Sequence, residues 1–348
     1  MNIFEWQKPL WRQLFADAEN MPHAMLMAGP EGLGKLSFAQ ALAARLLCEQ
    51  RNQADGPDGV ACGHCSSCTW LASGNHPDFR LILPDEGDDA GEEGESSAST
   101  RKPGQGPIRV DQIRALADFV YIGSHRHGSR IVVIAPAEAM NPAAANALLK
   151  VLEEPPSGVY FILVSSDWRR LIPTIRSRCR SIVFGLPDPS LAEQWLTAKG
   201  VKSAAELLRL TGGAPLLAAD WAEQGRLDSC KKAIEALVDK PLDPVAMAAK
   251  WSVLVKGTQG FGLPQLVETV QKWVFDLILL KMSGSLRYHQ GWRDKLEALA
   301  KQASSTGLLA CYTDLLRIRA VVRHPLNTQL FLEDLATRYL RVLTAGRA

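Results

Sequence analysis

The sequence predicts an α/β domain with a parallel sheet, followed by helical domains. In the first half of the chain, short apolar runs alternate with segments of helical periodicity, a pattern typical of parallel strands that helices cover on both faces. After residue 187 the strand-like runs stop and amphipathic helical patterns remain. We therefore expect an α/β domain at 1–186, a small three-helix domain at 187–225 and a larger helical domain at 226–348.

The expected elements follow in order along the chain. Apolar runs predict strands at 24–29, 79–83, 131–134, 159–164 and 181–184. Apolar side chains at helical spacing predict helices in the first domain at 36–47, 110–120 and 142–152. The same spacing predicts the later helices at 191–198, 203–211, 215–222, 263–281 and 326–343.

Composition and charge narrow the class of protein. With 348 residues, 47% of them hydrophobic, the chain can build a sizeable core and is not disordered as a whole. The formal net charge is only +2, so no overall basic field marks a nucleic-acid-binding protein, and any contact with DNA goes through local patches or partners. The N-terminus lacks the pattern of a signal peptide, and no apolar run reaches the roughly 20 residues of a membrane span, so we expect a soluble, cytoplasmic protein.

The segment 84–107 differs from the rest of the first domain. It holds seven acidic residues between 85 and 95, followed by a stretch rich in Ser, Gly and Pro. A segment this acidic and this poor in apolar residues predicts a disordered surface loop. A partner-binding role for the loop is the alternative.

A glycine-rich segment at 29–35 is the first motif that carries chemistry. It follows a predicted strand, opens a predicted helix and contains Gly29, Gly32, Gly34 and Lys35. In such a P-loop, backbone amides surround a phosphate while the lysine reaches the outer phosphates. The next residue should be Ser or Thr to hold Mg²⁺, but Leu36 stands there.

The second residue that should bind magnesium, an acidic one, is also missing. Phosphoryl transfer in P-loop proteins needs an acidic residue at the end of a second strand. The strand 131–134 runs instead into Ala135 and Pro136, and Glu138 comes too late, in the following turn. Two separate defects predict that this chain does not hydrolyse ATP by itself. Binding of phosphate or of a nucleotide (ATP or ADP) without hydrolysis stays open.

A cysteine cluster predicts a metal site within about 48–76. Cys62, Cys65 and Cys68 follow one another at the spacing of zinc ligands, and Cys48 lies upstream at the end of the P-loop helix. Four thiolates satisfy tetrahedral zinc and leave no open coordination position, so the zinc would be structural. His64 and His76 are the competing ligands, and packed free thiols are the alternative to a metal site.

Residues 145–156 read Ala-Asn-Ala-Leu-Leu-Lys-Val-Leu-Glu-Glu-Pro-Pro, and residues 177–179 read Ser-Arg-Cys. These two segments resemble the bacterial clamp-loader family of AAA+ proteins. The resemblance extends to the P-loop, the cysteine cluster, residues 108–114 and the Thr-Gly-Gly turn at 211–213, and so covers most of 1–220. It implies a RecA-like AAA+ domain with a four-cysteine zinc module, then a small helical lid and an all-α C-terminal collar that forms the ring.

Within this family, the degraded motifs resemble a non-catalytic subunit rather than the motor (gamma/tau) subunits. The Gly-Ala-Pro-Leu turn at 213–216 also lacks the lid arginine of a motor subunit. The resemblance implies that the protein joins motor and delta subunits in a hetero-oligomeric ring, which loads the sliding clamp onto primed DNA during replication. A polymerase label would then belong to the complex.

The resemblance also implies that Arg178, in the Ser-Arg-Cys segment, is an arginine finger for a neighbouring subunit's ATP site. A planar, permanently charged guanidinium suits the charge of a transferred phosphoryl group. Because Arg176 and Arg180 lie beside it, a solvated or salt-bridged surface arginine is the alternative. For the whole protein, the alternatives are an active motor-type AAA+ ATPase and a zinc-containing DNA-binding protein.

Overall fold

The computed structural model describes residues 3–16, 21–50, 59–84, 106–121, 129–240, 242–258, 260–322 and 327–344. The expected acidic loop lies almost wholly outside these residues. The chain divides into two compact units, Met1–Asp188 and Pro189–Ala348. The division predicted near residue 225 falls inside the second unit and stays a prediction.

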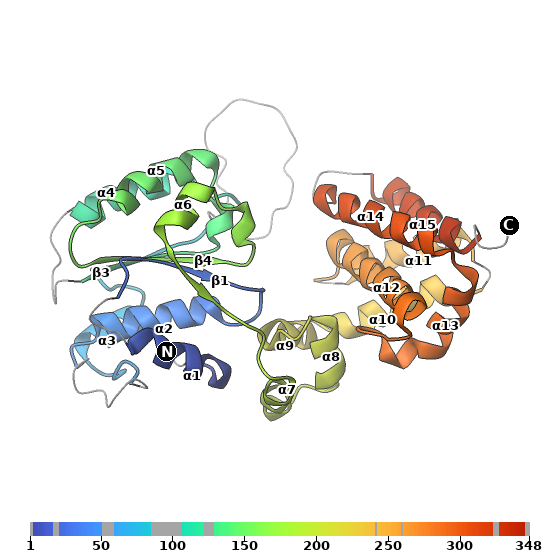
Figure 1. Ribbon diagram of the computed structural model, residues 1–348, viewed down its shortest axis with the longest axis horizontal. Coiled ribbons are helices and arrows are strands. Elements are labelled where there is room, and N and C mark those ends of the chain that lie inside the picture. The colour runs from blue at the N-terminus through green and yellow to red at the C-terminus, as the bar shows by residue number, and fades with distance from the viewer. Residues whose placement is uncertain are drawn as a thin grey trace. The chain divides into compact units, whose positions relative to one another are not determined.

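A five-stranded sheet forms the centre of the first unit (Figure 1). Its strands are β1 (Ala24–Ala28), β2 (Phe79–Ile82), β3 (Arg130–Ile134), β4 (Val159–Ser165) and β5 (Arg180–Val183). All four pairings are parallel, in the order β2-β3-β4-β1-β5. Each strand starts and ends within one residue of its predicted bounds.

Helices cover both faces of this sheet. On one face lie α1 (Lys8–Phe15), α2 (Lys35–Leu47) and α3 (Ser66–Ala72); on the other lie α4 (Val110–Tyr121), α5 (Pro142–Glu153) and α6 (Pro173–Arg178) (Figure 1). Every residue of β1 and β3 is buried, which explains why both strands are apolar apart from Arg130, the first residue of β3. The predicted class, a parallel sheet covered on both faces, is confirmed.

Three short helices were not predicted from the sequence. They are α1, α3 and α6, and the last two are only seven and six residues long. A segment of that length spans about two turns and gives too few repeats for a periodic pattern. These helices nevertheless position much of the candidate site.

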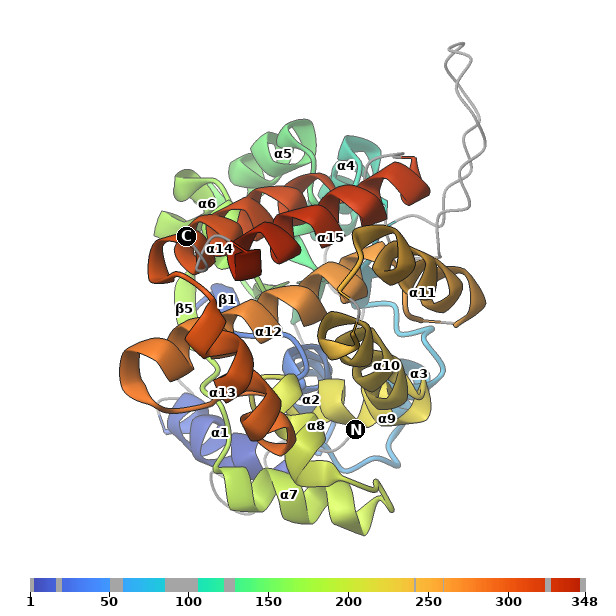
Figure 2. The same ribbon diagram turned by 90° about the vertical axis from the view of Figure 1, so that its right-hand side faces the viewer.

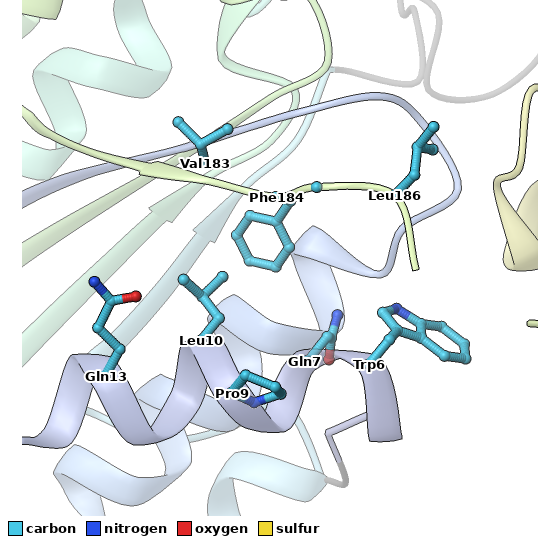
Figure 3. Close-up of a pocket in the computed structure, with 9 residues that line it drawn as sticks. Trp6, Gln7, Pro9, Leu10, Gln13, Val183, Phe184 and Leu186 are labelled. Carbon is cyan, nitrogen blue, oxygen red and sulfur yellow. The ribbon is translucent and has the colours of Figure 1, made fainter. Parts of the chain in front are cut away.

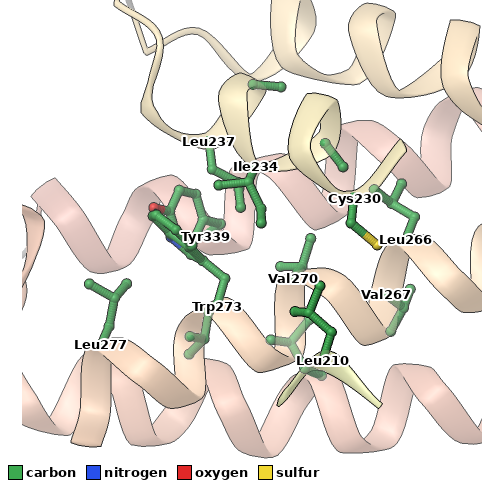
Figure 4. Packing of buried hydrophobic residues seen from close by; sticks show 14 of the residues in the cluster. Leu210, Cys230, Ile234, Leu237, Leu266, Val267, Val270, Trp273, Leu277 and Tyr339 are labelled. Atoms are coloured by element: carbon green, nitrogen blue, oxygen red, sulfur yellow. The ribbon is translucent and has the colours of Figure 1, made fainter. Parts of the chain in front are cut away.

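The second unit is entirely helical in its described residues. Its helices are α7 (Pro189–Ala198), α8 (Ala204–Leu210), α9 (Pro215–Glu223), α10 (Arg226–Val238), α11 (Pro244–Gly257), α12 (Leu263–Ser283), α13 (Arg293–Gln302), α14 (Ser305–Val321) and α15 (Thr328–Thr344). The long helix α12 packs against α10, α13 and α14 (Figure 2). One hydrophobic core runs through the unit, and within it the Trp273 Nε1 group donates a 3.0 Å hydrogen bond to the Tyr339 hydroxyl (Figure 4).

Two observations concern this unit and the membrane. Cys230 and Cys311 are buried in the hydrophobic core of this unit. Among the described residues, none of the helices is long and apolar enough to cross a membrane.

Candidate functional site: a phosphate loop, a surface arginine and a four-cysteine cluster

The phosphate loop has the predicted position between β1 and α2. Gly34 precedes α2 with a φ of 81°, a left-handed conformation that favours glycine. Gly29 lies so close to the end of β5 that an added Cβ would be 2.6 Å from the Phe184 carbonyl oxygen. The two glycines therefore serve the backbone path and close packing of the loop, as the motif predicts.

Lys35 makes its hydrogen bonds inside the protein. Its Nζ group donates to the Pro30 carbonyl at 2.6 Å and to the Ser166 hydroxyl at 3.1 Å, and the residue is 5% exposed. Burial lowers the pKa of Lys35 to about 8, although the nearby charges of Glu138 and Glu31 oppose this shift. The lysine that would reach an outer phosphate thus links its own loop to the end of β4.

Glu138 lies closer to the phosphate loop than its place in the sequence suggests. It belongs to a short 3-10 helix, Ala137–Ala139, after β3. Its Oε1 atom accepts hydrogen bonds from the backbone amides of Ser166 at 2.9 Å and Asp167 at 3.1 Å. Since parallel strands end at one edge of a sheet, the turn after β3 meets the turn after β4 there. The sequence interpretation missed both this tie and the contact of Ser166 with Lys35.

The positions that should hold magnesium carry no oxygen side chain. Leu36 follows Lys35 at the start of α2, and Ala135 and Pro136 follow β3. Glu138 supplies a carboxylate nearby, but one oxygen already accepts two amides. Its other oxygen, Oε2, is buried and has no hydrogen-bond partner among the residues that the structure describes.

An N-terminal segment, also missed from the sequence, packs on the phosphate loop. The Gln7 side chain is 1% exposed, and its Nε2 group donates to the carbonyls of Leu33 and Gly34, both at 2.9 Å. The Trp6 indole donates to the Leu33 carbonyl at 3.2 Å. Phe4 stacks on Trp6 with ring centroids 4.7 Å apart. The loop is therefore held from the side of α1 as well as from β4.

A groove of about 300 Å³ lies beside this segment, between α1 and the end of β5. Figure 3 shows Leu10 and Phe184 on its two sides, with Trp6 and Leu186 at one end. Its lining is largely apolar and contains no acidic or basic side chain. The groove offers space but no charged group for a phosphate.

Arg178 is the last residue of α6 and lies at the surface. Its Nη2 atom pairs with Glu153 Oε1 at 2.6 Å, and its Nη1 group donates to the Thr174 carbonyl at 3.1 Å. The side chain is 35% exposed. None of its hydrogen bonds or ion pairs with described residues reaches the phosphate loop. The structure therefore does not bring Arg178 together with Lys35, which is consistent with a role outside this chain's own loop.

The residues around Arg178 differ in their surroundings. The Arg176 guanidinium lies over the Trp168 ring, 5.2 Å from its centroid. Arg180 is exposed on β5. Cys179 is buried, and burial raises the pKa of its thiol to about 11.

The four predicted cysteines come together. Cys48 follows the end of α2, Cys65 caps α3, and Cys62 and Cys68 lie on either side of Cys65 in the chain. Their four sulfur atoms all lie within 4.8 Å of one another. A tetrahedral zinc with Zn–S bonds near 2.3 Å requires S···S distances of about 3.8 Å. The Cys62 and Cys68 sulfurs are 3.9 Å apart, which fits that tetrahedron and is far too long for a disulfide.

Backbone amides favour thiolates in this cluster. The amides of Cys62, Cys65 and Cys68 donate to the sulfurs of Cys48, Cys62 and Cys65 respectively, each at 3.4 Å. Burial opposes ionisation of Cys62, but amide groups of His64 and Cys65 lower its pKa to about 6, whereas burial raises the pKa of Cys48 and of Cys68. The cluster can hold a metal ion with four sulfur ligands.

Neither competing histidine joins the cluster. His64 is exposed, and its Nδ1 atom is 2.8 Å from the Cys62 carbonyl oxygen. His76 is buried, with Nε2 2.7 Å from the Ser67 hydroxyl and Nδ1 accepting from the Asp78 amide at 3.0 Å. Because Ser67 in turn donates to the Leu47 carbonyl, His76 braces α3 against the end of α2.

Known proteins similar to this chain place it in a family. The family model described as DNA polymerase III, delta subunit, matches residues 6–187. DNA polymerase III subunit delta' of Pseudomonas aeruginosa is 34% identical over 97% of this chain and 97% of its own length. The chain belongs to the DNA polymerase III delta-prime family.

Two more distant similarities extend beyond delta-prime. DNA polymerase III subunit gamma/tau of Mycobacterium bovis is 32% identical over 50% of this chain and 26% of its own length. A solved gamma subunit-related protein of DNA polymerase III from Thermotoga maritima aligns over 96% of this chain and 99% of its own, with 17% identity and a TM-score of 0.44. Membership of the delta-prime family confirms the predicted clamp-loader resemblance.

Proposed function

We propose that this chain is a non-catalytic clamp-loader subunit of DNA polymerase III, which helps to load the sliding clamp onto primed DNA. One observation carries this proposal: the phosphate loop keeps its backbone path but lacks its magnesium ligands, and its lysine is bonded internally. Such a loop supports the fold without supporting hydrolysis. The polymerase activity belongs to the complex and not to this chain.

In this proposal, Arg178 acts in trans. It reaches the surface at the end of α6 and supplies a guanidinium to the ATP site of a neighbouring motor subunit. There it would stabilise the charge that spreads over the transferred phosphoryl group, an effect worth about 10³- to 10⁵-fold in rate in other P-loop proteins. Arg178 would therefore make this chain necessary for hydrolysis at a site it does not contain.

The partners follow from the same proposal. The chain would sit in a ring with motor (gamma/tau) and delta subunits, and would meet the clamp and primed DNA through that complex. Residues 226–348 would form the collar that joins the ring, with 187–225 as the lid. The four cysteines would hold a structural zinc, since four sulfur ligands leave no position for substrate.

The test is clamp- and DNA-stimulated ATP hydrolysis by reconstituted motor and delta subunits. We expect the chain alone to be silent, the wild type to stimulate, and Arg178→Ala to assemble but lose most of the added rate. Arg180→Ala is the matched control, because Arg180 is an exposed arginine two residues away. If Arg178→Ala and the wild type stimulate ATP hydrolysis equally, Arg178 is not an arginine finger and the chain contributes to the complex through assembly alone.

A motor-type ATPase is the second candidate, and Glu138 is the observation that favours it. The negative charge of its carboxylate favours the protonated form of Lys35. The carboxylate also lies at the sheet edge where P-loop proteins hold magnesium. Hydrolysis of ATP by the isolated chain, lost in Glu138→Gln, would support this candidate. Binding of nucleotide without hydrolysis would leave the proposed function unchanged.

A further inference from the structure

The partner of Arg178 is a carboxylate in an unfavourable place. Glu153 is the last residue of α5, and Arg178 is the last residue of α6. The partial negative charge at a helix C-terminus favours a cation such as Arg178 and disfavours an anion such as Glu153. A residue that breaks a local rule in this way points to a role beyond folding.

The contact between them leaves much of the guanidinium available. An arginine side chain has five N–H donors. In the described structure, one Nη2 bond goes to Glu153 and one Nη1 bond goes to the Thr174 carbonyl. With 35% of the Arg178 side chain and 50% of the Glu153 side chain exposed, a phosphate can approach the remaining donors.

The Thr174 contact alone does not fix the arginine. Thr174 lies four residues before Arg178 in the same short helix, so its carbonyl restrains the guanidinium only towards its own backbone. Glu153 comes from a different helix and holds the Nη2 side of the guanidinium through its carboxylate. The next residue, Glu154, has the same charge and is also exposed, but makes no ion pair with a described residue.

We propose that Glu153 is a positioning residue that holds the Arg178 guanidinium in a fixed orientation before a neighbour's nucleotide arrives. This inference rests on the proposed function of Arg178. An arginine carries several rotatable bonds, and ordering them in advance lowers the cost of ordering them in the transition state. Because an exposed pair contributes little to folding, its loss should affect the rate and leave stability nearly unchanged.

The experiment measures kcat and KM for ATP in the reconstituted clamp loader with clamp and primed DNA. Four forms of the chain are compared: wild type, Glu153→Ala, Arg178→Ala and the double variant. We expect Glu153→Ala to lower the stimulated kcat roughly five-fold, the rate equivalent of about 1 kcal/mol. KM should stay unchanged, since the neighbour's own loop binds the nucleotide. Glu153→Gln should recover part of the rate, because its amide oxygen still accepts a hydrogen bond.

Controls separate positioning from folding. Glu154→Ala should behave as wild type, and all variants should keep the thermal unfolding midpoint and the assembly of the complex. In the Arg178→Ala background, Glu153→Ala should have no further effect, because Glu153 acts only through that arginine.

The possible failures are distinguishable. A normal rate for Arg178→Ala would overturn the proposed function and, with it, this inference. A reduced rate for Arg178→Ala together with a normal rate for Glu153→Ala would overturn the inference alone. An equal loss from Glu153→Ala with and without Arg178 would show that Glu153 acts on the fold.

Discussion

Loss of a sulfur ligand provides a direct test of the proposed zinc site. The hydrophobic cluster around α3 consists of the buried Cys48, Cys65 and Cys68, with Ala61 and Cys62 partly buried against it. None of these residues belongs to the main cluster between the sheet and α4 to α6. Besides the brace through His76 to α2 and the buried Leu71, we therefore expect the proposed metal to hold the conformation of segment 59–72.

The magnitude follows from this arrangement. Structural zinc contributes about 10–16 kcal/mol of binding free energy in small zinc-dependent peptides. Substitution of residues that only hydrogen-bond to the ligands already lowers metal affinity roughly 10- to 100-fold. Cys68→Ser removes a ligand itself, so we expect it to weaken zinc binding by more than about 100-fold. The loss of order should stay local to 59–72 while the parallel sheet persists.

Two measurements check this expectation. The wild type should carry one zinc per chain by atomic emission, and replacement by Co²⁺ should give the absorption of a four-sulfur site. Hydrogen exchange should speed up in 59–72 of Cys68→Ser and stay unchanged in β1 to β4. Cys230→Ala is the control, because Cys230 is buried in the other unit, 3.5 Å from the Thr269 hydroxyl. Wild-type protein without stoichiometric metal, and with the same exchange rates as Cys68→Ser, would refute the site.

Three further predictions concern buried polar groups. Asp276 is fully buried and accepts hydrogen bonds from the amides of residues 287–289 and from His289, so Asp276→Ala should cost about 3–5 kcal/mol in urea unfolding. Burial opposes ionisation of Asp276, but these hydrogen bonds lower its pKa below the usual 3.8. The ionised carboxylate should therefore stabilise the fold fully above pH 3.8, and this stabilisation should be lost as the pH falls through the folded-state pKa. Asp276→Ala should lack this pH dependence of the free energy of unfolding. Burial lowers the pKa of Lys35 from 10.5 to about 8, so between these two pH values Lys35 is protonated in the unfolded chain and largely neutral in the folded one. The free energy of unfolding of the wild type should therefore rise with pH in this range relative to that of Lys35→Met. The same pH dependence in both proteins would contradict this. Gln7→Ala removes two hydrogen bonds to the phosphate loop and should cost about 1–3 kcal/mol, and an unchanged unfolding midpoint would show that the loop needs no such support.

The centre of the sheet was predictable because β1, β3 and β4 are buried almost throughout. β3 is wholly apolar apart from its first residue, Arg130, so its bounds follow from hydrophobicity alone. The four cysteines were predictable because metal ligands leave a spacing in the sequence, and their sulfurs do lie together. Periodic hydrophobic patterns and metal ligands at short, fixed spacing can therefore be recognised in the sequence alone.

The contacts of the phosphate loop were not predictable in the same way. Glu138 looked misplaced because the interpretation counted residues from the strand end, whereas its partners are amides at the end of another strand, 28 and 29 residues away. Gln7 reaches carbonyls 26 and 27 residues away from a segment without a motif. Parallel order at the sheet edge offered a usable signal for Glu138, since the turns after β3 and β4 must meet there. No such signal exists for Gln7.

These contacts also explain why a loop without magnesium ligands still has its lysine. In a motor subunit, the P-loop lysine binds the phosphates of the nucleotide. A subunit that does not hydrolyse ATP would be expected to lose this lysine if phosphate binding were its one role. Here the Lys35 ammonium joins the Pro30 carbonyl to the Ser166 hydroxyl, and Glu138 fixes the Ser166 backbone from the other side. Removing the lysine would take one donor from both the Pro30 carbonyl and the Ser166 hydroxyl, and the loss of these two loop contacts does not depend on nucleotide. A folding role is therefore sufficient to account for Lys35, and its presence is not evidence that the chain hydrolyses ATP.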